Sequence, residues 1–288
     1  MKESNKHKIF AILVMAFSFV LTVSAQTNLS ALIPMLNKVE QLEGKPYRFV
    51  EGRTSIAYGG EELHFGAETL ADVIQHRTGI AVPLVSNVAR ADIVLAIDSA
   101  LTGDEHYRIH VSRKGIALTG STVAALFRAV TTIDQLLMGD ALSSACGEMA
   151  PVIVDDAPRF ARRALMLDPA RHFLPVEDVK FFIDQMAKYK YNVLQLHLTD
   201  DQGWRVAIHS HPRLASKQHY TQEELRHIIH YAAQRHIEVV PEVDIPGHTV
   251  AILAAYPELS CSHLRTDTIR PTAWSVPPTN GATKCSPM

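Results

Sequence analysis

Three short stretches of the sequence combine carboxylates with histidine or arginine: LDPARHF (167–173), HLTDDQGWR (197–205) and PEVDIPGH (241–248). Carboxylates and histidines exchange protons with substrates, and the planar guanidinium of arginine binds carboxylates and hydroxyl groups. The second stretch holds two adjacent carboxylates, Asp200 and Asp201, which could form a catalytic pair. Because adjacent carboxylates often stabilise turns instead, the sequence leaves open whether they catalyse or support a group elsewhere.

Two pairings between these residues have a chemical purpose. Arg171 can pair with Asp200 and still reach the hydroxyl groups of a sugar. Asp244 and His248 lie four residues apart across a Pro-Gly turn, so the carboxylate can hydrogen-bond the imidazole, fix its tautomer and raise its basicity. The alternative for His248 is a histidine at the rim of the fold whose polar groups are satisfied by a loop.

Each stretch lies at the end of a predicted strand. Apolar segments at 164–168, 192–198 and 237–244 predict strands, and helical patterns at 174–190 and 221–236 separate them. Strands that alternate with helices of this length predict βα units and a parallel sheet, as in a (β/α)8 TIM barrel, whose active sites lie where the carboxyl ends of the strands meet. The residues expected at this rim are Asp168, His197, Asp200, Glu242 and Asp244.

A metal site is the rival interpretation of these residues. Nine histidines lie between His172 and His248, and barrel hydrolases can hold zinc with aspartate and histidine at strand ends. The one H-x-H pair, at 209–211, precedes Pro212 and reads as an exposed turn away from any carboxylate at a strand end. We therefore expect no metal and no cofactor.

The N-terminal half has a different pattern. Residues 29–155 predict a mixed α/β domain in which a small sheet packs on two helices, one ending at Gly79 and one beginning after Ser121 or Thr122. No cluster of catalytic residue types lies in it, so we interpret it as an accessory scaffold. The charged segment 154–163 contains a proline, and we place the domain boundary there, with domains at 26–155 and 156–260.

The N-terminus predicts export. Three lysines precede an uncharged apolar run at 9–23, and small residues up to Ala25 follow it, which is the order of a cleavable signal peptide. The alternative is a membrane anchor, but a membrane-spanning helix needs about 20 apolar residues. We predict that residues 1–25 are removed by cleavage after Ala25 and that the protein is periplasmic, cell-surface or secreted.

Composition excludes some classes of partner. The formal net charge of the 288-residue chain is −2, which argues against nucleic acid binding. There are three cysteines, an odd number that cannot form a disulfide framework, although a bridge between Cys261 and Cys285 is possible.

The three stretches and the segments between them resemble the start of the catalytic barrel of glycoside hydrolase family 20, the β-N-acetylhexosaminidases. The resemblance is strong over residues 155–261, and residues 29–155 are similar to the accessory α/β domain of that family. It implies hydrolysis of terminal N-acetylhexosamine from a glycan or chitooligosaccharide-like substrate, with retention of configuration and with the substrate's own acetamido oxygen as the nucleophile.

The resemblance also implies roles for individual residues. Arg171 and Asp200 resemble the pair that binds hydroxyls of the terminal sugar, and Asp244 with His248 resembles the pair that tunes the catalytic glutamate. Supporting positions around them are Asp168, His197, Asp201 and Glu242.

The catalytic pair of the family is not found in this sequence. No H-x-G-G-D-E motif occurs, no adjacent Asp-Glu follows His248, and the segment 261–288 is rich in Ser, Thr and Pro. We therefore expect a divergent, disordered tail at 261–288 and about three of the eight βα units of a barrel. Two hypotheses remain: an enzyme by family, or a truncated, inactive fragment whose N-terminal domain is at most a binding module. A third hypothesis, which the sequence favours least, is a metal-dependent barrel hydrolase.

Overall fold

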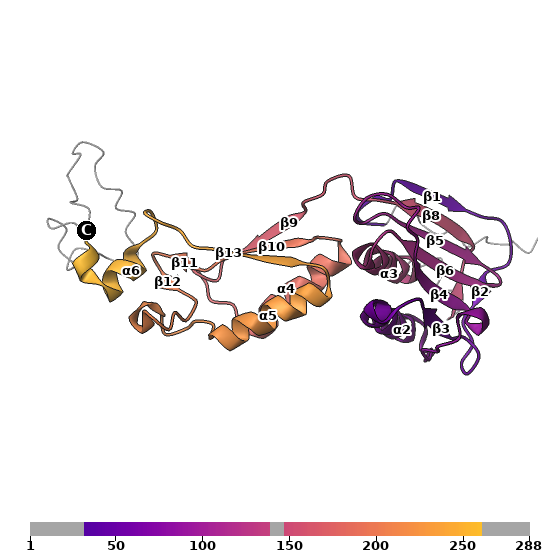
Figure 1. The fold of residues 1–288 in the computed structure, drawn as a ribbon, viewed down its shortest axis with the longest axis horizontal. Helices are drawn as coiled ribbons and strands as arrows, with labels where there is room; N and C mark the ends of the chain where they lie inside the picture. The colour runs from indigo at the N-terminus through magenta and orange to yellow at the C-terminus, as the bar shows by residue number, and fades with distance from the viewer. Residues whose placement is uncertain (1–31, 139–146, 261–288) are drawn as a thin grey trace, which may run out of the picture.

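The computed structural model describes residues 32–138 and 147–260 (Figure 1). The expected signal peptide at 1–25, the expected tail at 261–288 and the three cysteines lie outside these residues. The described chain forms two units that follow one another along an elongated molecule (Figure 1). Within the described ranges, no helix has the length and apolarity needed to cross a bilayer.

The first unit is built on a six-stranded mixed sheet. Strand β5 pairs antiparallel with β6 and β8, whereas β4 pairs parallel with β6 and β3. In spatial order the strands are β1 (Lys38–Gln41), β8 (Val152–Asp156), β5 (Tyr107–Ser112), β6 (Gly115–Gly120), β4 (Ile93–Ile97) and β3 (Ile56–Tyr58). A short antiparallel pair, β2 (Tyr47–Arg48) with β7 (Glu148–Met149), lies beside this sheet. Since β8 extends to Asp156, the accessory sheet continues one residue beyond the domain boundary expected from the sequence.

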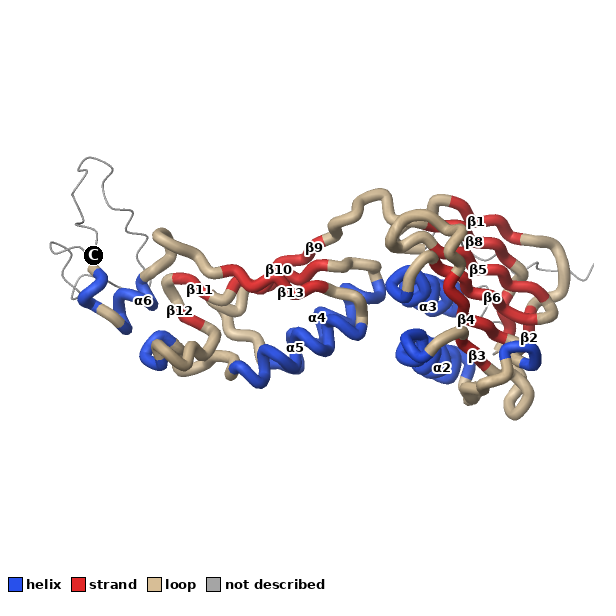
Figure 2. Tube along the Cα trace, viewed as in Figure 1, coloured by secondary structure: helices blue, strands red, loops and turns tan. Residues whose placement is uncertain are grey.

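Two helices cover one face of the six-stranded sheet, as the sequence predicts (Figure 2). Helix α2 (His64–Thr78) ends at Gly79, whose φ of 76° is the left-handed conformation that glycine adopts at helix ends. Helix α3 (Val123–Met138) is nearly all buried, and the Thr122 hydroxyl accepts a hydrogen bond from the backbone N–H of Ala125. The cap is therefore Thr122 rather than Ser121. The two helices and the sheet share one hydrophobic core.

The second unit contains the three βα repeats that the sequence predicts. Strand β10 (Val193–His197) lies between β9 (Ala164–Leu167) and β13 (Glu238–Glu242), and all three are parallel. Helices α4 (Val176–Lys188) and α5 (Gln222–Gln234) follow β9 and β10, and the short α6 (Val250–Ala255) follows β13. Thr221 and Glu224 form the capping box expected at the start of α5. The described residues form an open three-stranded sheet and not a closed barrel.

Several short elements complete the chain. A two-stranded ribbon of β11 (Thr199–Asp200) and β12 (Gly203–Trp204) follows β10. The short 3-10 helices are η2 (Glu61–Leu63), η3 (Val88–Arg90), η4 (Pro212–Leu214) and η5 (Pro257–Leu259).

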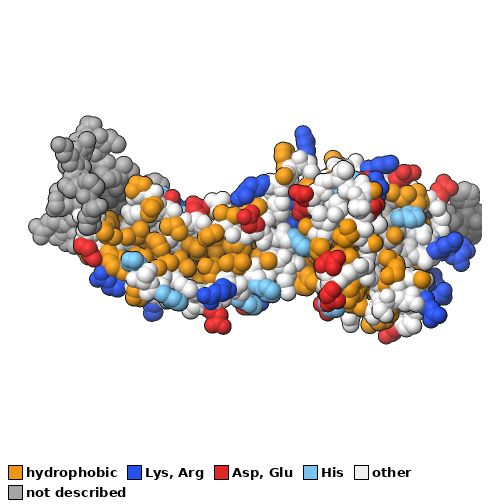
Figure 3. All heavy atoms as spheres, viewed as in Figure 1, with side chains coloured by type: hydrophobic (Ala, Val, Ile, Leu, Met, Phe, Trp, Pro, Cys, Tyr) orange, Lys and Arg blue, Asp and Glu red, His pale blue; other side chains and the backbone are white. Residues whose placement is uncertain are grey.

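Figure 3 shows a broad apolar band along the second unit. The large exposed apolar side chains of the second unit include Met166, Phe181, Ile229, Val243, Ile245 and Leu259.

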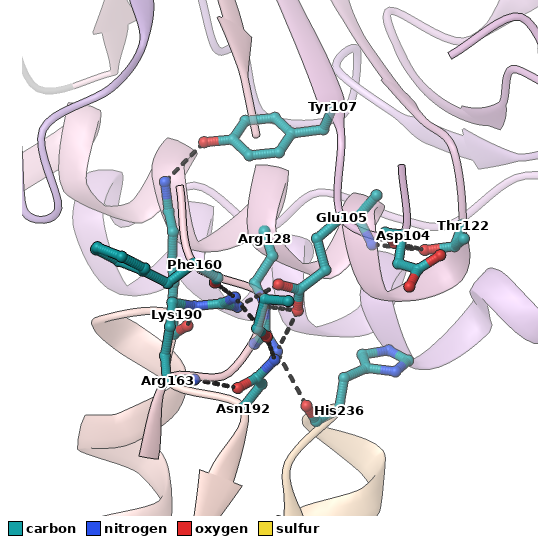
Figure 4. A network of polar contacts seen from close by, with 12 residues as sticks. Asp104, Glu105, Tyr107, Thr122, Arg128, Phe160, Arg163, Lys190, Asn192 and His236 are labelled. Carbon is teal, nitrogen blue, oxygen red and sulfur yellow. Dashed lines mark hydrogen bonds and ion pairs between the residues drawn. The ribbon is translucent and has the colours of Figure 1, made fainter. Parts of the chain in front are cut away.

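A buried ion-pair network joins the two units (Figure 4). Arg128 of α3 is only 1% exposed, and its Nε donates to Oε1 of Glu105 at 2.9 Å. The second carboxylate oxygen of Glu105 pairs with Arg163, which precedes β9. Arg128 also donates to the backbone carbonyls of Arg235 at 3.3 Å and His236 at 2.9 Å, just after α5. Because the last carbonyls of a helix lack partners within it, the accessory helix caps a helix of the barrel unit.

A second buried contact lies beside the first. Lys190, which follows α4, donates to the Tyr107 hydroxyl at 2.7 Å and pairs with Oδ2 of Asp156 at 3.1 Å (Figure 4 draws the tyrosine contact). Burial lowers the pKa of Lys190, and the partial compensation by Asp156 does not restore it. Since each charged group here has partners on the other unit, the two units are held in one relative orientation.

Replacing Arg128 tests this network. Arg128→Leu leaves Glu105 buried with one partner and two carbonyls uncapped, and breaking a buried pair in this way costs about 3–5 kcal/mol. We expect a loss of this size in the free energy of unfolding, measured by urea titration. Arg108→Leu is the matched control, because Arg108 pairs with Asp155 at 2.7 Å with half its side chain exposed, and such surface pairs contribute less than about 1 kcal/mol. Equal losses in the two variants would contradict the assignment.

Candidate active site

The rim residues expected from the sequence do meet at the carboxyl end of the three-stranded sheet. His197 ends β10 and is in register with Glu242, which ends β13. Asp168 directly follows β9, and Asp200 lies in β11, three residues beyond β10. Parallel pairing is the cause, since it brings the ends of three sequence-distant strands to one edge.

Asp200 is the centre of this cluster. Its side chain is 2% exposed. Its Oδ2 lies 2.8 Å from Nη2 of Arg171 and 3.1 Å from Nε2 of His197. Its Oδ1 lies 3.1 Å from Nδ1 of His248 and accepts the backbone N–H of Asp201 at 2.6 Å. Burial alone would raise the pKa of Asp200, but these donors outweigh it and the pKa is lowered. Asp200 is therefore an ionised acceptor and a poor proton donor at neutral pH.

Arg171 forms the expected pair with Asp200 and remains accessible. Its Nη1 donates to Oδ2 of Asp168 at 2.7 Å, and its backbone N–H donates to the other oxygen of the same carboxylate at 3.0 Å. The hydrogen bond that the guanidinium donates to Asp168 raises the pKa of Arg171, burial opposes it, and the charge of Asp200 adds to the rise, so the pKa is raised. The side chain is still 46% exposed, so a fixed cation faces solvent with donor capacity to spare.

His197 links two carboxylates. Its Nδ1 lies 2.9 Å from Oε1 of Glu242, and its Nε2 faces Asp200. Burial lowers the pKa of His197, but the hydrogen bonds to Asp200 and Glu242 exceed that effect and the pKa is raised. A hydrogen bond from Gln195 and the contact with His197 lower the pKa of Glu242. The arrangement favours an imidazolium held between two ionised carboxylates.

The loop that carries Asp244 and His248 contacts residues that follow β10. His248 lies over β11, with Nδ1 3.1 Å from Oδ1 of Asp200 and 4.0 Å from Oδ2 of Asp201. The backbone N–H of Asp244 donates to the Thr199 hydroxyl at 2.9 Å, and its carboxylate lies near His197. The loop after β13 therefore lies against the β10–β11 segment, where each of these residues meets a partner.

Three further residues position the site and were not predicted from the sequence. Arg205 is 8% exposed and donates to the carbonyls of Pro169 and Ala170, which fixes the loop that carries Arg171. Thr199 and Gln195 orient the β13 loop and Glu242. The available signal for Arg205 was its place at the end of the HLTDDQGWR stretch, but Pro169 and Ala170 lie more than thirty residues away in the sequence.

Two groups of side chains have the types of atom that could ligate a cation. In each group, the candidate ligand atoms lie within 4.8 Å of one another: His197, Glu242 and Asp244 in one, and Asp200, Asp201 and His248 in the other. Both nitrogens of His197 already face carboxylates, so a metal would have to displace a hydrogen bond. The contacts are accounted for by a hydrogen-bonded network.

The geometry answers whether the adjacent aspartates act as a catalytic pair. The carboxylate of Asp200 is occupied by four donors, and Oδ1 of Asp201 accepts the backbone N–H of Val250 at 3.2 Å. They belong to a binding and positioning array in which Arg171 is the exposed cation.

The pKa of His197 provides a test of this array. In Asp200→Asn the charged hydrogen-bond partner is lost while burial remains, so we expect the pKa of His197 to fall, as measured from its imidazole NMR signals. The raised pKa stabilises the fold below the unfolded value of about 6.5, and this contribution is lost as pH rises through the folded pKa. Asp200→Asn should therefore reduce the stability advantage of mildly acidic pH. Asp201→Asn is the control and should leave the His197 titration unchanged; equal shifts in both variants would refute the array.

Comparison with known families agrees with this geometry. Residues 29–157 match the model for "Glycosyl hydrolase family 20, domain 2", and residues 160–286 match the model for its catalytic domain. The second match extends beyond Cys261, where the motifs described above end.

Individual relatives are similar over most of this chain. The beta-hexosaminidase of Porphyromonas gingivalis is 35% identical over 233 residues, which are 74% of this chain and 30% of the relative. The beta-N-acetylhexosaminidase of Cellulomonas fimi is 35% identical over 82% of this chain and 50% of its own. The structure of Streptomyces plicatus N-acetyl-beta-hexosaminidase with thio-NAglucal has a TM-score of 0.75 and 40% identity, covering 82% of this chain and 50% of that one.

The chain thus spans between about a third and a half of the length of these relatives. Since its two units match two successive domains of one family, this chain belongs to glycoside hydrolase family 20.

Proposed function

We propose that this chain supplies the sugar-holding part of a β-N-acetylhexosaminidase active site. The observation that carries the proposal is the exposed Arg171 guanidinium, fixed by Asp168 and by the buried Asp200 at the mouth of the strands. A planar cation with spare donors beside a carboxylate suits the vicinal hydroxyls of a pyranose ring. Related structures support the choice of sugar: Streptomyces plicatus beta-hexosaminidase binds thio-NAglucal in one and the product GlcNAc in another.

The proposed substrate is a glycan with a terminal β-linked N-acetyl-D-hexosamine, such as a chitooligosaccharide. The reaction would retain configuration, with the acetamido oxygen of the substrate as nucleophile. In this scheme Arg171 and Asp200 bind the hydroxyls of the terminal sugar. His248 and Asp244 hold the loop after β13 against the same network, where they would tune a proton-transferring carboxyl group.

Hydrolysis itself needs groups beyond this array. The sequence contains no H-x-G-G-D-E motif. The carboxylate of Asp200 accepts hydrogen bonds from its neighbours and is a poor proton donor. We therefore expect the 288-residue chain alone to bind the terminal sugar without cleaving an aryl N-acetyl-β-glucosaminide. Turnover well above background would contradict this expectation, and turnover that survives a chelator would also argue against a metal-dependent mechanism.

Binding of N-acetylglucosamine tests the role of Arg171. Arg171→Met removes the charged donors, and hydrogen bonds to charged groups contribute about 1.5–3 kcal/mol, so we expect binding roughly ten- to a hundredfold weaker by calorimetric titration. Arg171→Lys keeps the charge but loses the planar guanidinium, so its affinity for N-acetylglucosamine should lie between those of the parent and of Arg171→Met.

Arg226→Met is the control for this experiment, because Arg226 is exposed on helix α5 and, among residues 32–138 and 147–260, its side chain donates to Gln222 one turn away. It should bind N-acetylglucosamine as the parent does. Unchanged affinity in Arg171→Met would reject the proposed sugar site.

We also propose that the protein is exported through a cleavable signal peptide. The support is the order of lysines, apolar run and small residues at 1–25. N-terminal sequencing of the protein from periplasm or medium should then begin at Gln26, and Val14→Arg in the apolar run should leave the uncleaved precursor in the cytoplasm. A protein that keeps Met1 outside the cytoplasm would contradict cleavage.

A further inference from the structure

A basic hollow lies on the accessory domain, apart from the strand ends of the barrel unit. It has a volume of about 900 Å³. Strand β2 forms part of its wall, at the end of the molecule away from β9, β10 and β13 (Figure 1). Figure 3 shows Lys and Arg side chains at this end. The cations that line the hollow are Lys45, Arg48, Arg53, Arg113 and Lys114.

The charge of the hollow is opposite in sign to that of the whole chain. Its five cations face two carboxylates, Asp92 and Glu148, which leaves a formal charge of +3, whereas the chain carries −2. Arg48 is taken by Glu148, with Nε 2.8 Å from Oε1. Within the described residues, the other four cations make no side-chain hydrogen bond or ion pair, so their donors are available to a ligand.

Ordered turns carry three of these cations, Arg53, Arg113 and Lys114. In the first turn, the backbone N–H groups of Arg53 and Thr54 donate to the Val50 carbonyl at 3.1 and 2.9 Å. In the second, the tip of the β5–β6 hairpin is pressed against Asp92: a Cβ on Gly115 would lie 2.3 Å from the Asp92 carbonyl oxygen. Arg113 and Lys114 occupy this tip. Because the backbone is already ordered, a ligand would have to order only the side chains.

The aromatic and apolar residues that line the hollow indicate which class of anionic ligand fits it. Tyr47 is the aromatic residue in the wall and is 3% exposed, so it offers no platform on which a nucleic acid base could stack. Val50 is the large apolar side chain exposed there, at 39%, which is too little apolar surface for a membrane. Several separated cations fit a chain that carries repeated charges better than they fit one small ion.

We propose that the basic hollow binds an anionic polysaccharide bearing sulfate esters, and so tethers the protein to charged glycans. The preference for a glycan over other polyanions rests on the proposed function, whereas the location and the charge of the ligand do not. Arginine and lysine would meet sulfate oxygens through charge-assisted hydrogen bonds.

Calorimetric titration of the 288-residue chain with a heparin octasaccharide in 50 mM NaCl tests the proposal. We expect saturable binding that weakens steeply as salt rises. Loss of two exposed ion pairs in Arg53→Ser/Arg113→Ser should weaken it roughly five- to thirtyfold. Lys38→Ser/Arg226→Ser removes the same charge from exposed positions that do not line the hollow, and should change binding less than about twofold.

Each comparison decides one part of the proposal. No heparin binding in 50 mM NaCl, or equal losses in the two double variants, would overturn the site. Equal affinity for polyphosphate or for oligothymidylate of matched charge would overturn the assignment to a glycan. Neutral chitohexaose, a ligand of the proposed sugar site, should bind Arg53→Ser/Arg113→Ser as it binds the parent, and an equal loss of chitohexaose and heparin binding would overturn the hollow as a separate site. The measurements with heparin, polyphosphate and oligothymidylate use neither hydrolysis nor Arg171, so they can fail while the sugar site stands, and the sugar site can fail while they succeed.

Discussion

The buried carboxylate of Asp200 is the interaction on which the strand-end site depends. A carboxylate that is 2% exposed must have its charge compensated. Its partners come from separate parts of the chain: Arg171 from the loop after β9, His197 from the end of β10 and His248 from the loop after β13. The need to satisfy one buried charge therefore holds three strand ends in a common geometry. The same need leaves Arg171 fixed, charged and partly open to solvent.

A second buried carboxylate has the corresponding role at the opposite ends of the strands. Glu105 holds Arg128 of the accessory domain and Arg163, which precedes β9, and Arg128 in turn binds the carbonyls that follow α5 (Figure 4). The accessory domain thus supports the amino-terminal side of the parallel sheet, while the site lies on its carboxyl side. The far end of the accessory domain, where the basic hollow lies, takes part neither in the contact with the parallel sheet nor in the strand-end site.

Local signals in the sequence predicted the elements well where the cause is local. The helix stop at Gly79, the capping box of Thr221 and Glu224, and the alternation of strands and helices after residue 163 all depend on neighbouring residues, and all are confirmed. Strands β1 and β8 were not predicted, because their pairing joins Lys38 to Asp155 across more than a hundred residues. The choice between Ser121 and Thr122 as a cap depended on side-chain direction, which the sequence does not contain.

The sequence by itself determined the family, the order of the two units and the residue types at the strand ends, since the motifs and periodicities that carry them are local and contiguous. The Arg171–Asp200 pair could also be anticipated, because parallel strands bring their ends together. Only the tertiary structure decided that His248 faces Asp200, that Arg205 holds the loop of Arg171, and that five cations from separate segments share one hollow. Those contacts depend on how loops fold back over neighbouring segments, and sequence spacing does not encode that direction.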